Sequence, residues 1–367
     1  MSFGARALIR LGALEHNLDV LRSVAPGARV MAVIKANAYG HGLVPVARHL
    51  EAADSLAVAR LPEALVLREA GIDKPIVLLA GVASEDELRV AFARGFELVV
   101  HDIAQVEMLE RANDSRGTVW LKFDTGMNRL GFPPDAAPEL RPRLEAAGAV
   151  RELRLMTHFA SADELDNATT RTQLAAFAPV AGGFPGAVSI ANSPASLGWP
   201  QVIDARAELG FEGDFWIRPG ISLFGISPFA DKTGRELGLK PVMQFEARLI
   251  AVKSLHAGAR VGYKGAYVCE QDTTLGIVAA GYGDGYTRHF RSGTPVLLNG
   301  RRVSLIGNVS MDMCAVDLGP GAADRVGDIA TLWGDELPVE EVAPWADAIP
   351  YELVCGVMNR EDSEIVP

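Results

Sequence analysis

The sequence predicts an α/β protein: a (β/α)8 barrel of the TIM type, followed by a mainly β C-terminal domain. Three observations lead to this prediction. Short apolar runs alternate with helix-like segments over the first two thirds of the 367 residues, as in a parallel sheet with right-handed crossovers. About eight such repeats fit a closed barrel better than an open sheet, which would place a G-x-G-x-x-G turn after the first strand. Beyond residue 231 the apolar runs follow one another without helices.

The first barrel strand is expected at residues 28–36, because a continuous run rich in Val and Ile is typical of a strand buried on both faces. Residues 42–53 have helical spacing and provide the first crossover. The later strands are similar apolar runs, expected at 55–60, 75–81, 96–102, 118–126, 152–160, 187–193 and 215–221. Helical spacing is found between most of them, at 62–71, 84–95, 103–112, 138–148 and 167–182.

The second domain follows a connector rich in Gly, Pro and charge at 231–244. We expect a barrel domain over residues 1–231 and a β domain over residues 232–367. An Asn-Gly pair at 299–300 lies between two apolar runs and predicts a hairpin. Residues 7–11 also have the composition of a strand, which precedes the first helix and could belong to the β domain. The remaining β-like runs are 244–256, 273–282, 294–308, 313–319 and 328–334.

Composition excludes several classes of function. The formal charge of −11 argues against nucleic acid or an anionic membrane as the main partner. No run approaches the ~20 apolar residues that span a bilayer, and charges interrupt the N-terminal apolar run, unlike a signal peptide. Widely separated cysteines and unclustered histidines predict neither disulfides nor a metal site. We therefore expect a cytoplasmic protein, with small buried hydrophobes at Cys269, Cys314 and Cys355.

Chemistry in such a barrel takes place where the strands end. Here the strand ends carry Lys35, Lys122, His158, Ser193 and Arg218. A lysine within an apolar strand must be neutral, paired or modified, because a lone buried ammonium is costly. The alternative is that each stem extends to the barrel rim and leaves its charge in water. Because a neutral lysine amine attacks carbonyl compounds, this pattern suits pyridoxal phosphate.

A bound phosphate would need hydrogen-bond donors near these lysines. The Ser193 hydroxyl, the backbone N–H groups of Gly220 and Ile221, and a tyrosine hydroxyl are suitable donors.

A family resemblance is carried by the string AVIKANAYGHG at residues 32–42, which is similar to the cofactor-lysine signature of the alanine racemases, pyridoxal-phosphate enzymes of the barrel type. The similarity covers nearly the whole chain, up to residue 359, and the tail at 358–367 departs from the family's usual basic end. The further blocks that carry it, in order, are WLKFDTGMNRLGF, THFASAD, ANSPAS, IRPGISLFG, VGYKGAY, GYGDGY, GNVSMDMC and YELVC.

This resemblance implies that pyridoxal 5'-phosphate is held covalently by Lys35. It implies that Arg218 faces the pyridine nitrogen and that His158 lies near the ring. The resemblance also implies a set of groups around the cofactor phosphate: Tyr39, Ser193, Gly220, Ile221 and Tyr351.

The resemblance further implies two catalytic bases, with Lys35 acting on D-alanine and Tyr263 on L-alanine. Tyr263 and the Met311–Asp312 pair would come from the other subunit of a head-to-tail homodimer. Arg129 and the Met311 backbone N–H would hold the substrate carboxylate, and Tyr282 and Asp312 would line the substrate entrance. A tyrosine is a poor base at neutral pH, so nearby positive charge, relayed along Tyr263–His158–Arg218, would have to favour its phenolate.

Lys122 resembles a position that is carbamylated in many relatives. Carbon dioxide adds only to a neutral amine, and the resulting anion would orient Arg129. The alternative is an unmodified lysine paired with Asp124.

The expected activity is interconversion of L-alanine and D-alanine, which would supply D-alanine for peptidoglycan or serve alanine catabolism. A racemase for serine or for a broader set of amino acids is an alternative, because a small methyl side chain is selected mainly by exclusion. Decarboxylation of basic amino acids would call for a Cys-Asp pair where this chain reads NVSMDM. A cofactor carrier protein would not need the second base in the β domain.

Overall fold

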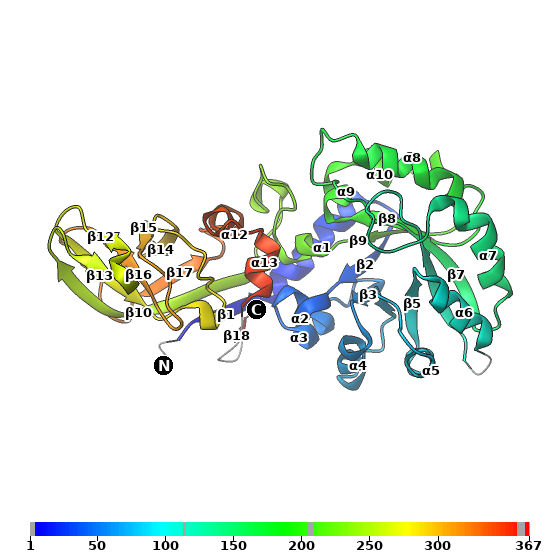
Figure 1. Ribbon diagram of the computed structural model, residues 1–367, viewed down its shortest axis with the longest axis horizontal. Coiled ribbons are helices and arrows are strands. Elements are labelled where there is room, and N and C mark those ends of the chain that lie inside the picture. The colour runs from blue at the N-terminus through cyan, green and yellow to red at the C-terminus, as the bar shows by residue number, and fades with distance from the viewer. Residues whose placement is uncertain (1–3, 113–114, 205–207, 358–363, 367) are drawn as a thin grey trace. The chain divides into compact units, whose positions relative to one another are not determined.

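The computed structural model describes residues 4–112, 115–204, 208–357 and 364–366. The chain forms two compact units (Figure 1). The barrel unit contains Glu15–Ala38 and Leu43–Leu223. The β unit contains the chain up to Leu14, a short excursion at Tyr39–Gly42, and the chain from Phe224 onward. The boundary expected near residue 231 remains a prediction.

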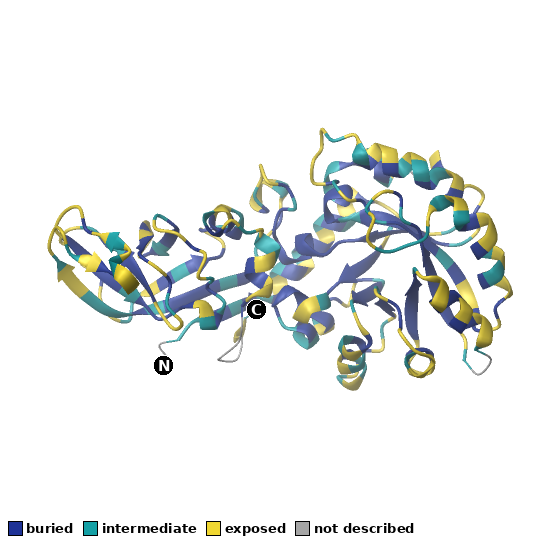
Figure 2. Cartoon of the chain, viewed as in Figure 1, coloured by how far each residue is buried: buried dark blue, intermediate teal, exposed yellow. Residues whose placement is uncertain are grey.

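The barrel unit is a closed ring of eight parallel strands within the described residues, as the apolar runs predict. The ring closes where β9 pairs with β2, with Val30 opposite Ile217. Nearly every strand residue is buried (Figure 2), because the strands are covered on both faces. The strands are β2 Arg29–Val33, β3 Ser55–Val58, β4 Ile76–Leu78, β5 Phe96–Val100, β6 Gly117–Lys122, β7 Val150–Met156, β8 Val188–Asn192 and β9 Phe215–Arg218.

Helices follow most of these strands, and side-chain caps fix where several of them begin. The Ser84 hydroxyl accepts a backbone N–H at the start of α5, and the Asp102 carboxylate does so at the start of α6. In the described part of the chain, no helix is long and apolar enough to cross a membrane. The helices are α1 Leu11–Val24, α3 Leu43–His49, α4 Leu61–Glu69, α5 Glu85–Ala93, α6 Ile103–Arg111, α7 Ala137–Ala146, α8 Thr169–Ala181, α9 Ser193–Gly198 and α10 Pro200–Ile203.

The barrel interior contains a charged layer that the sequence did not reveal. The Arg154 guanidinium lies 5.1 Å and 5.4 Å from the ring centroids of Trp120 and Trp216, and 3.2 Å from the Glu97 carboxylate. These contacts join β6 to β9, which are not neighbours in the ring, so they cross the interior. Trp120 and Lys122 are two residues apart in β6, so their side chains share the inner face. The layer formed by Arg154, Glu97 and the two tryptophans therefore lies next to Lys122 inside the barrel.

The β unit is built on an antiparallel sheet with strand order β13-β16-β15-β14-β17-β10-β1-β18, in which β13 also pairs with β10. Strand β1 (Arg6–Arg10) pairs with β10. The Asn-Gly hairpin is confirmed, because Asn299 and Gly300 both have positive φ between β14 and β15. The other elements are β10 Met243–Leu255, β11 Arg260–Val261, β12 Tyr267–Val268, β13 Thr273–Val278, β14 Pro295–Leu298, β15 Arg301–Ile306, β16 Cys314–Asp317, β17 Ile329–Trp333, β18 Glu364–Val366, α12 Val339–Val342 and α13 Pro350–Cys355.

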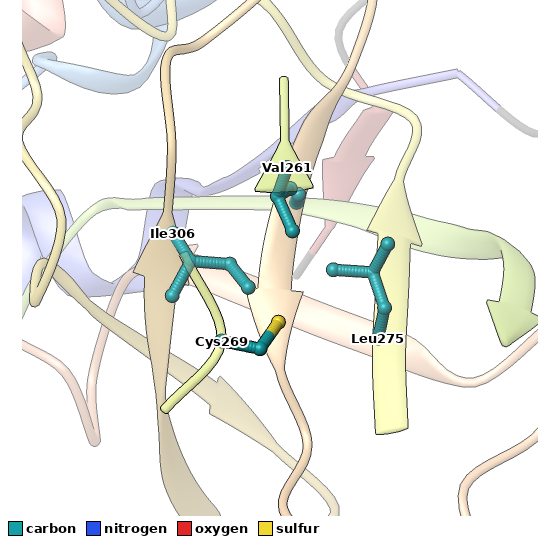
Figure 3. Close-up of a cluster of buried hydrophobic side chains, with 5 residues drawn as sticks. Val261, Cys269, Leu275 and Ile306 are labelled. Atoms are coloured by element: carbon teal, nitrogen blue, oxygen red, sulfur yellow. The ribbon is translucent and has the colours of Figure 1, made fainter. Parts of the chain in front are cut away.

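Part of the β unit's core is the cluster in Figure 3, where Cys269 packs with Val261, Leu275 and Ile306. Cys314 is buried as well, so the expectation of small buried hydrophobes is right for these two cysteines. It is wrong for Cys355, which is exposed near the end of α13. The tail that departs from the family pattern lies largely outside the described residues, although its residues 364–366 pair with β1 as strand β18.

Candidate active site

Five of the predicted side chains lie at the carboxyl ends of the barrel strands. Lys122 and Arg218 are the last residues of β6 and β9. Lys35 and His158 follow β2 and β7 by two residues, and Ser193 begins α9 directly after β8. Carboxyl ends of parallel barrel strands meet at one rim. The barrel therefore gathers these groups at a single mouth.

Arg218 is a buried guanidinium held by neutral acceptors. It donates to the Ser189 hydroxyl and the Thr157 carbonyl, both at 2.6 Å, and to Nδ1 of His158 at 3.3 Å. Burial lowers the pKa of Arg218 to about 9, which leaves the group charged at neutral pH. An arginine can only donate, so Nδ1 of His158 accepts, and its ring proton lies on Nε2.

His158 is a neutral imidazole. Burial lowers its pKa well below 6.5, and the positive charges of Arg218, Lys122, Arg129 and Lys35 lower it further. Arg218 thus donates to a neutral His158 ring that offers its Nε2 proton, and the expected relay of charge to Tyr263 stays a prediction.

Lys122 has an unusually low pKa. Burial is the main cause, the charges of Arg218, Arg129 and Lys35 add to it, and Asp124 opposes them, so the pKa falls from 10.5 to about 8. An ordinary lysine is almost wholly protonated at neutral pH, whereas a pKa near 8 leaves about a tenth of the amine neutral at pH 7. Lys122 is therefore a better nucleophile than a surface lysine.

The Asp124 carboxylate organises the loop that carries Arg129. It accepts four successive backbone N–H groups at 2.9–3.1 Å, from Gly126 through Arg129. Burial raises the pKa of Asp124, but these four bonds outweigh it and hold the pKa below its usual value. Asp124 stays charged and partly offsets the cations around Lys122, and the alternative of a Lys122–Asp124 ion pair stays a prediction. The barrel mouth is suited to binding an anion, because it holds four basic side chains: Lys35, Lys122, Arg129 and Arg218.

The chain after Lys35 makes a left-handed turn, α2 (Lys35–Tyr39). Ala36, Asn37, Ala38 and Tyr39 all have φ between 53° and 54°. Non-glycine residues avoid this region, at a cost of about 1–2 kcal/mol each. The Asn37 side chain accepts the Leu43 N–H at 2.9 Å and so ties the turn to α3. Such strain is common at functional sites, where surrounding contacts maintain it.

Ser193 and Gly220 form a small cluster of polar groups. The Ser193 hydroxyl accepts the Gly220 N–H at 2.9 Å. A hydroxyl that accepts in this way has its own proton to donate. Ile221 begins the short 3-10 turn Ile221–Phe224 directly beyond. This cluster has the donor types that a phosphate requires.

The β unit brings two of the predicted tyrosines together. The rings of Tyr39 and Tyr351 have centroids 6.2 Å apart, and Phe224 packs against Tyr39 at 5.1 Å. Burial, with smaller contributions from Tyr351 and Cys355, raises the pKa of Tyr39 far above its usual value. Tyr39 is therefore a firmly protonated phenol that can donate a hydrogen bond.

The remaining predicted residues lie on the exposed surface of the β unit. Tyr263 is 70% exposed and Met311 is 51% exposed, and Tyr282 and Asp312 are exposed as well. Two backbone bonds join the Tyr282 loop to the Met311 loop, from Tyr282 N–H to the Ser310 carbonyl and from Gly283 N–H to the Met311 carbonyl. The Tyr282 and Met311 loops therefore lie side by side in the β unit.

Comparison with known proteins decides the family. Residues 9–228 match the family described as "Alanine racemase, N-terminal domain", and residues 242–365 match "Alanine racemase, C-terminal domain". The chain belongs to the alanine racemase family. The predicted resemblance and the predicted fold class are both confirmed.

Individual relatives support this assignment over the full length. The chain is 48% identical to "Alanine racemase" of Vibrio atlanticus (strain LGP32) across 99% of both chains. It is 49% identical to "Alanine racemase" of Yersinia pestis bv. Antiqua (strain Angola) across 97% of both. Among solved structures, the biosynthetic alanine racemase from Pseudomonas aeruginosa superposes with a TM-score of 0.92 at 39% identity, covering 100% of both chains.

Sequence reasoning missed three features of this site. Asp124 was noted only as a partner for Lys122, yet its main bonds are to the backbone of the Arg129 loop. The Asp-x-Gly spacing was an available signal, since an aspartate often accepts the backbone N–H two residues on. The left-handed turn has only a weak signal in the sequence, because alanines do not favour positive φ. The sequence contains no local signal for the Arg154 layer.

Proposed function

We propose that this protein interconverts L-alanine and D-alanine with pyridoxal 5'-phosphate as cofactor. The observation that carries the proposal is the set of basic groups around Lys35 at the barrel mouth, in a chain that belongs to the alanine racemase family. The cofactor, when bound, supplies the electron sink that makes the α-proton of an amino acid removable. The protein supplies the amine that holds the cofactor, the two bases, and the groups that bind the cofactor phosphate and the substrate carboxylate.

The donor set at the barrel mouth suits this cofactor. Lys35, Lys122, Arg129 and Arg218 lie close enough together for their positive charges to interact, and the nearby Asp124 carboxylate accepts backbone bonds. In this proposal Lys35 binds the cofactor covalently and Arg218 donates to its ring nitrogen. His158 lies beside the ring. The phosphate is bound by Tyr39, Ser193, Gly220, Ile221 and Tyr351.

Racemisation needs two bases on opposite faces of the α-carbon. We propose Lys35 for one face and Tyr263 for the other, with Arg129 and the Met311 N–H holding the substrate carboxylate and Tyr282 and Asp312 at the entrance. A catalytic phenol that is 70% exposed is poorly suited to proton transfer in water-excluded surroundings. We therefore propose that a second copy of the chain covers it in a head-to-tail homodimer.

The activity is tested with purified protein. Absorbance should reveal the bound cofactor, and the optical rotation of L-alanine should decay to zero. Tyr263→Phe should keep the absorbance and lose racemisation. Visible absorbance without racemisation of alanine in the parent protein would contradict the proposal.

The shared site is tested by mixing two inactive variants. Copies carrying Lys35→Ala and copies carrying Tyr263→Phe should regain activity when they exchange subunits, because one site of each mixed dimer has both bases. Random exchange would restore about a quarter of the parent sites, since half of the dimers are mixed and each has one intact site. Absence of recovery in a dimer shown by mass to be mixed would place both bases in one chain.

We also propose that Lys122 carries a carbamate. Its pKa of about 8 supports this, because carbon dioxide needs a neutral amine, and the added negative charge would offset the surrounding cations. Protein exchanged into 13C-bicarbonate should show a carbamate carbon signal that Lys122→Met lacks. The same spectrum from both proteins would exclude the modification.

The product of this reaction is proposed to be D-alanine for peptidoglycan, made in the cytoplasm. Similarity to a biosynthetic alanine racemase supports the peptidoglycan role. The three cysteines in thiol form suit the reducing conditions of the cytoplasm. Expression should relieve the D-alanine requirement of a racemase-deficient bacterium.

A further inference from the structure

Glu63, in the first turn of α4, bonds to two parts of the barrel unit. One carboxylate oxygen accepts the N–H groups of Ala59 and Arg60 at 2.8 Å and 3.1 Å. The other accepts the Ala36 N–H at 2.7 Å. Ala36 directly follows Lys35 and precedes Glu63 by 27 residues in the chain. The same side chain thus caps a helix and holds the backbone beside Lys35.

The next two helices show how much of this arrangement is ordinary capping. In α5 the Glu87 carboxylate accepts the Ala83 N–H at 2.8 Å, and in α6 the Gln105 amide oxygen accepts the His101 N–H at 2.9 Å. Both positions correspond to Glu63 in the repeating βα unit. Because Gln105 caps with an amide, capping needs one oxygen and no charge. The second oxygen of Glu63 is therefore not required by α4.

The residue held by this second oxygen begins the left-handed turn. Ala36 has a φ of 54°, and three further non-glycine residues continue the same conformation. A turn of this kind persists only when surrounding contacts determine it. The Ala38 N–H bonds to the Ile34 carbonyl at 2.9 Å and Asn37 holds Leu43. The Glu63 bond lies at the Lys35 end of the turn.

We propose that Glu63 is a positioning residue for Lys35. Its carboxylate fixes the amide of Ala36, sets the backbone from which the Lys35 side chain extends, and so aims the Lys35 amine. The inference rests on the proposed role of Lys35 as the cofactor lysine and as one of two bases. Lys35 approaches the α-carbon from one face and Tyr263 from the other, so a loss of Glu63 should weaken proton transfer on the Lys35 face selectively.

The decisive variant is Glu63→Gln in the cofactor-loaded enzyme. A glutamine can turn its oxygen to Ala59 and Arg60 and still cap α4, but its NH2 then faces the Ala36 N–H, where two donors cannot bond. Glu87→Gln is the matched control, because it removes the same charge from the corresponding position of α5. The thermal midpoints of the two variants should be similar.

The expected result is a split between kinetic constants. Relative to Glu87→Gln, Glu63→Gln should lower kcat about fivefold or more with KM within about twofold, the signature of a lost transition-state interaction. The isotope effect with α-deuterated alanine should rise in the direction where Lys35 removes the proton, from D-alanine, and less in the other. The visible absorbance and its pH profile should shift in Glu63→Gln alone.

Two further outcomes define the limits of the inference. Glu63→Asp keeps the charge but shortens the reach, so it should lower kcat as Glu63→Gln does, and it serves as the test if Glu63→Gln folds poorly. A kcat for both Glu63 variants equal to that of Glu87→Gln, or isotope effects that rise equally in both directions, would overturn the positioning role. An inactive parent protein would instead contradict the proposed function.

Discussion

Replacing Lys122 with methionine should stabilise the cofactor-free protein, because Lys122 is an ammonium in surroundings that disfavour its charge. The pKa of Lys122 falls from 10.5 to about 8 on folding, and the residue is 8% exposed. Each unit of pKa difference corresponds to about 1.4 kcal/mol. Lys122 therefore costs the folded state about 3 kcal/mol at pH 7.

The pH dependence gives the sign of this effect. Between pH 8 and pH 10.5 the unfolded chain binds more protons at Lys122 than the folded chain does, so stability rises with pH in this range. The free-energy cost of Lys122 to the folded state has its full value below about pH 8 and falls to about 2 kcal/mol at pH 9. The advantage of Lys122→Met over the parent should therefore shrink by about 1 kcal/mol between pH 7 and pH 9.

Urea unfolding of both proteins, freed of cofactor and of carbon dioxide, measures this difference at the two pH values. Comparison of the variants cancels every group that they share, so the change with pH isolates Lys122. Bicarbonate added at pH 8 should stabilise the parent and leave Lys122→Met unchanged. A stability difference that stays constant from pH 7 to pH 9 would refute the reasoning.

Three further perturbations test other parts of the site. Asp124→Asn replaces the carboxylate that accepts the backbone of the Arg129 loop with an amide. Since hydrogen bonds to a charged group contribute about 1.5–3 kcal/mol, KM for alanine should rise tenfold or more. The thermal midpoint should change little. Gly40→Ala would place a Cβ against a backbone carbonyl of α13 at a residue with φ +81°, so the variant should melt well below the parent and bind cofactor weakly by absorbance titration. Arg154→Ala leaves the buried Glu97 carboxylate without its charged partner and should cost about 3 kcal/mol or more in urea unfolding; a loss below about 1 kcal/mol would show that the interior layer is not a strong ion pair.

Local patterns in the sequence were sufficient to predict the barrel. Runs such as 28–36 and 96–102 alternate with helical segments because each unit buries its apolar face in the same way. The Asn-Gly hairpin was predictable for a similar reason, since its two residues tolerate positive φ. The ends of the barrel strands were predictable to within four residues, and this placed Lys122 and Arg218 at the barrel mouth.

The sequence by itself determined the fold class, the family and the residue types at the strand ends, because these depend on periodicity and on short motifs. The tertiary structure alone decided how the site residues are held. The bond from Glu63 to Ala36 spans 27 residues and the pair Arg154–Glu97 spans 57. No local pattern specifies such contacts, since they form only when the closing barrel brings distant strands together. The left-handed turn beside Lys35 depends on long-range contacts such as the Glu63–Ala36 bond, because its own residues oppose that conformation and the surrounding fold supports it.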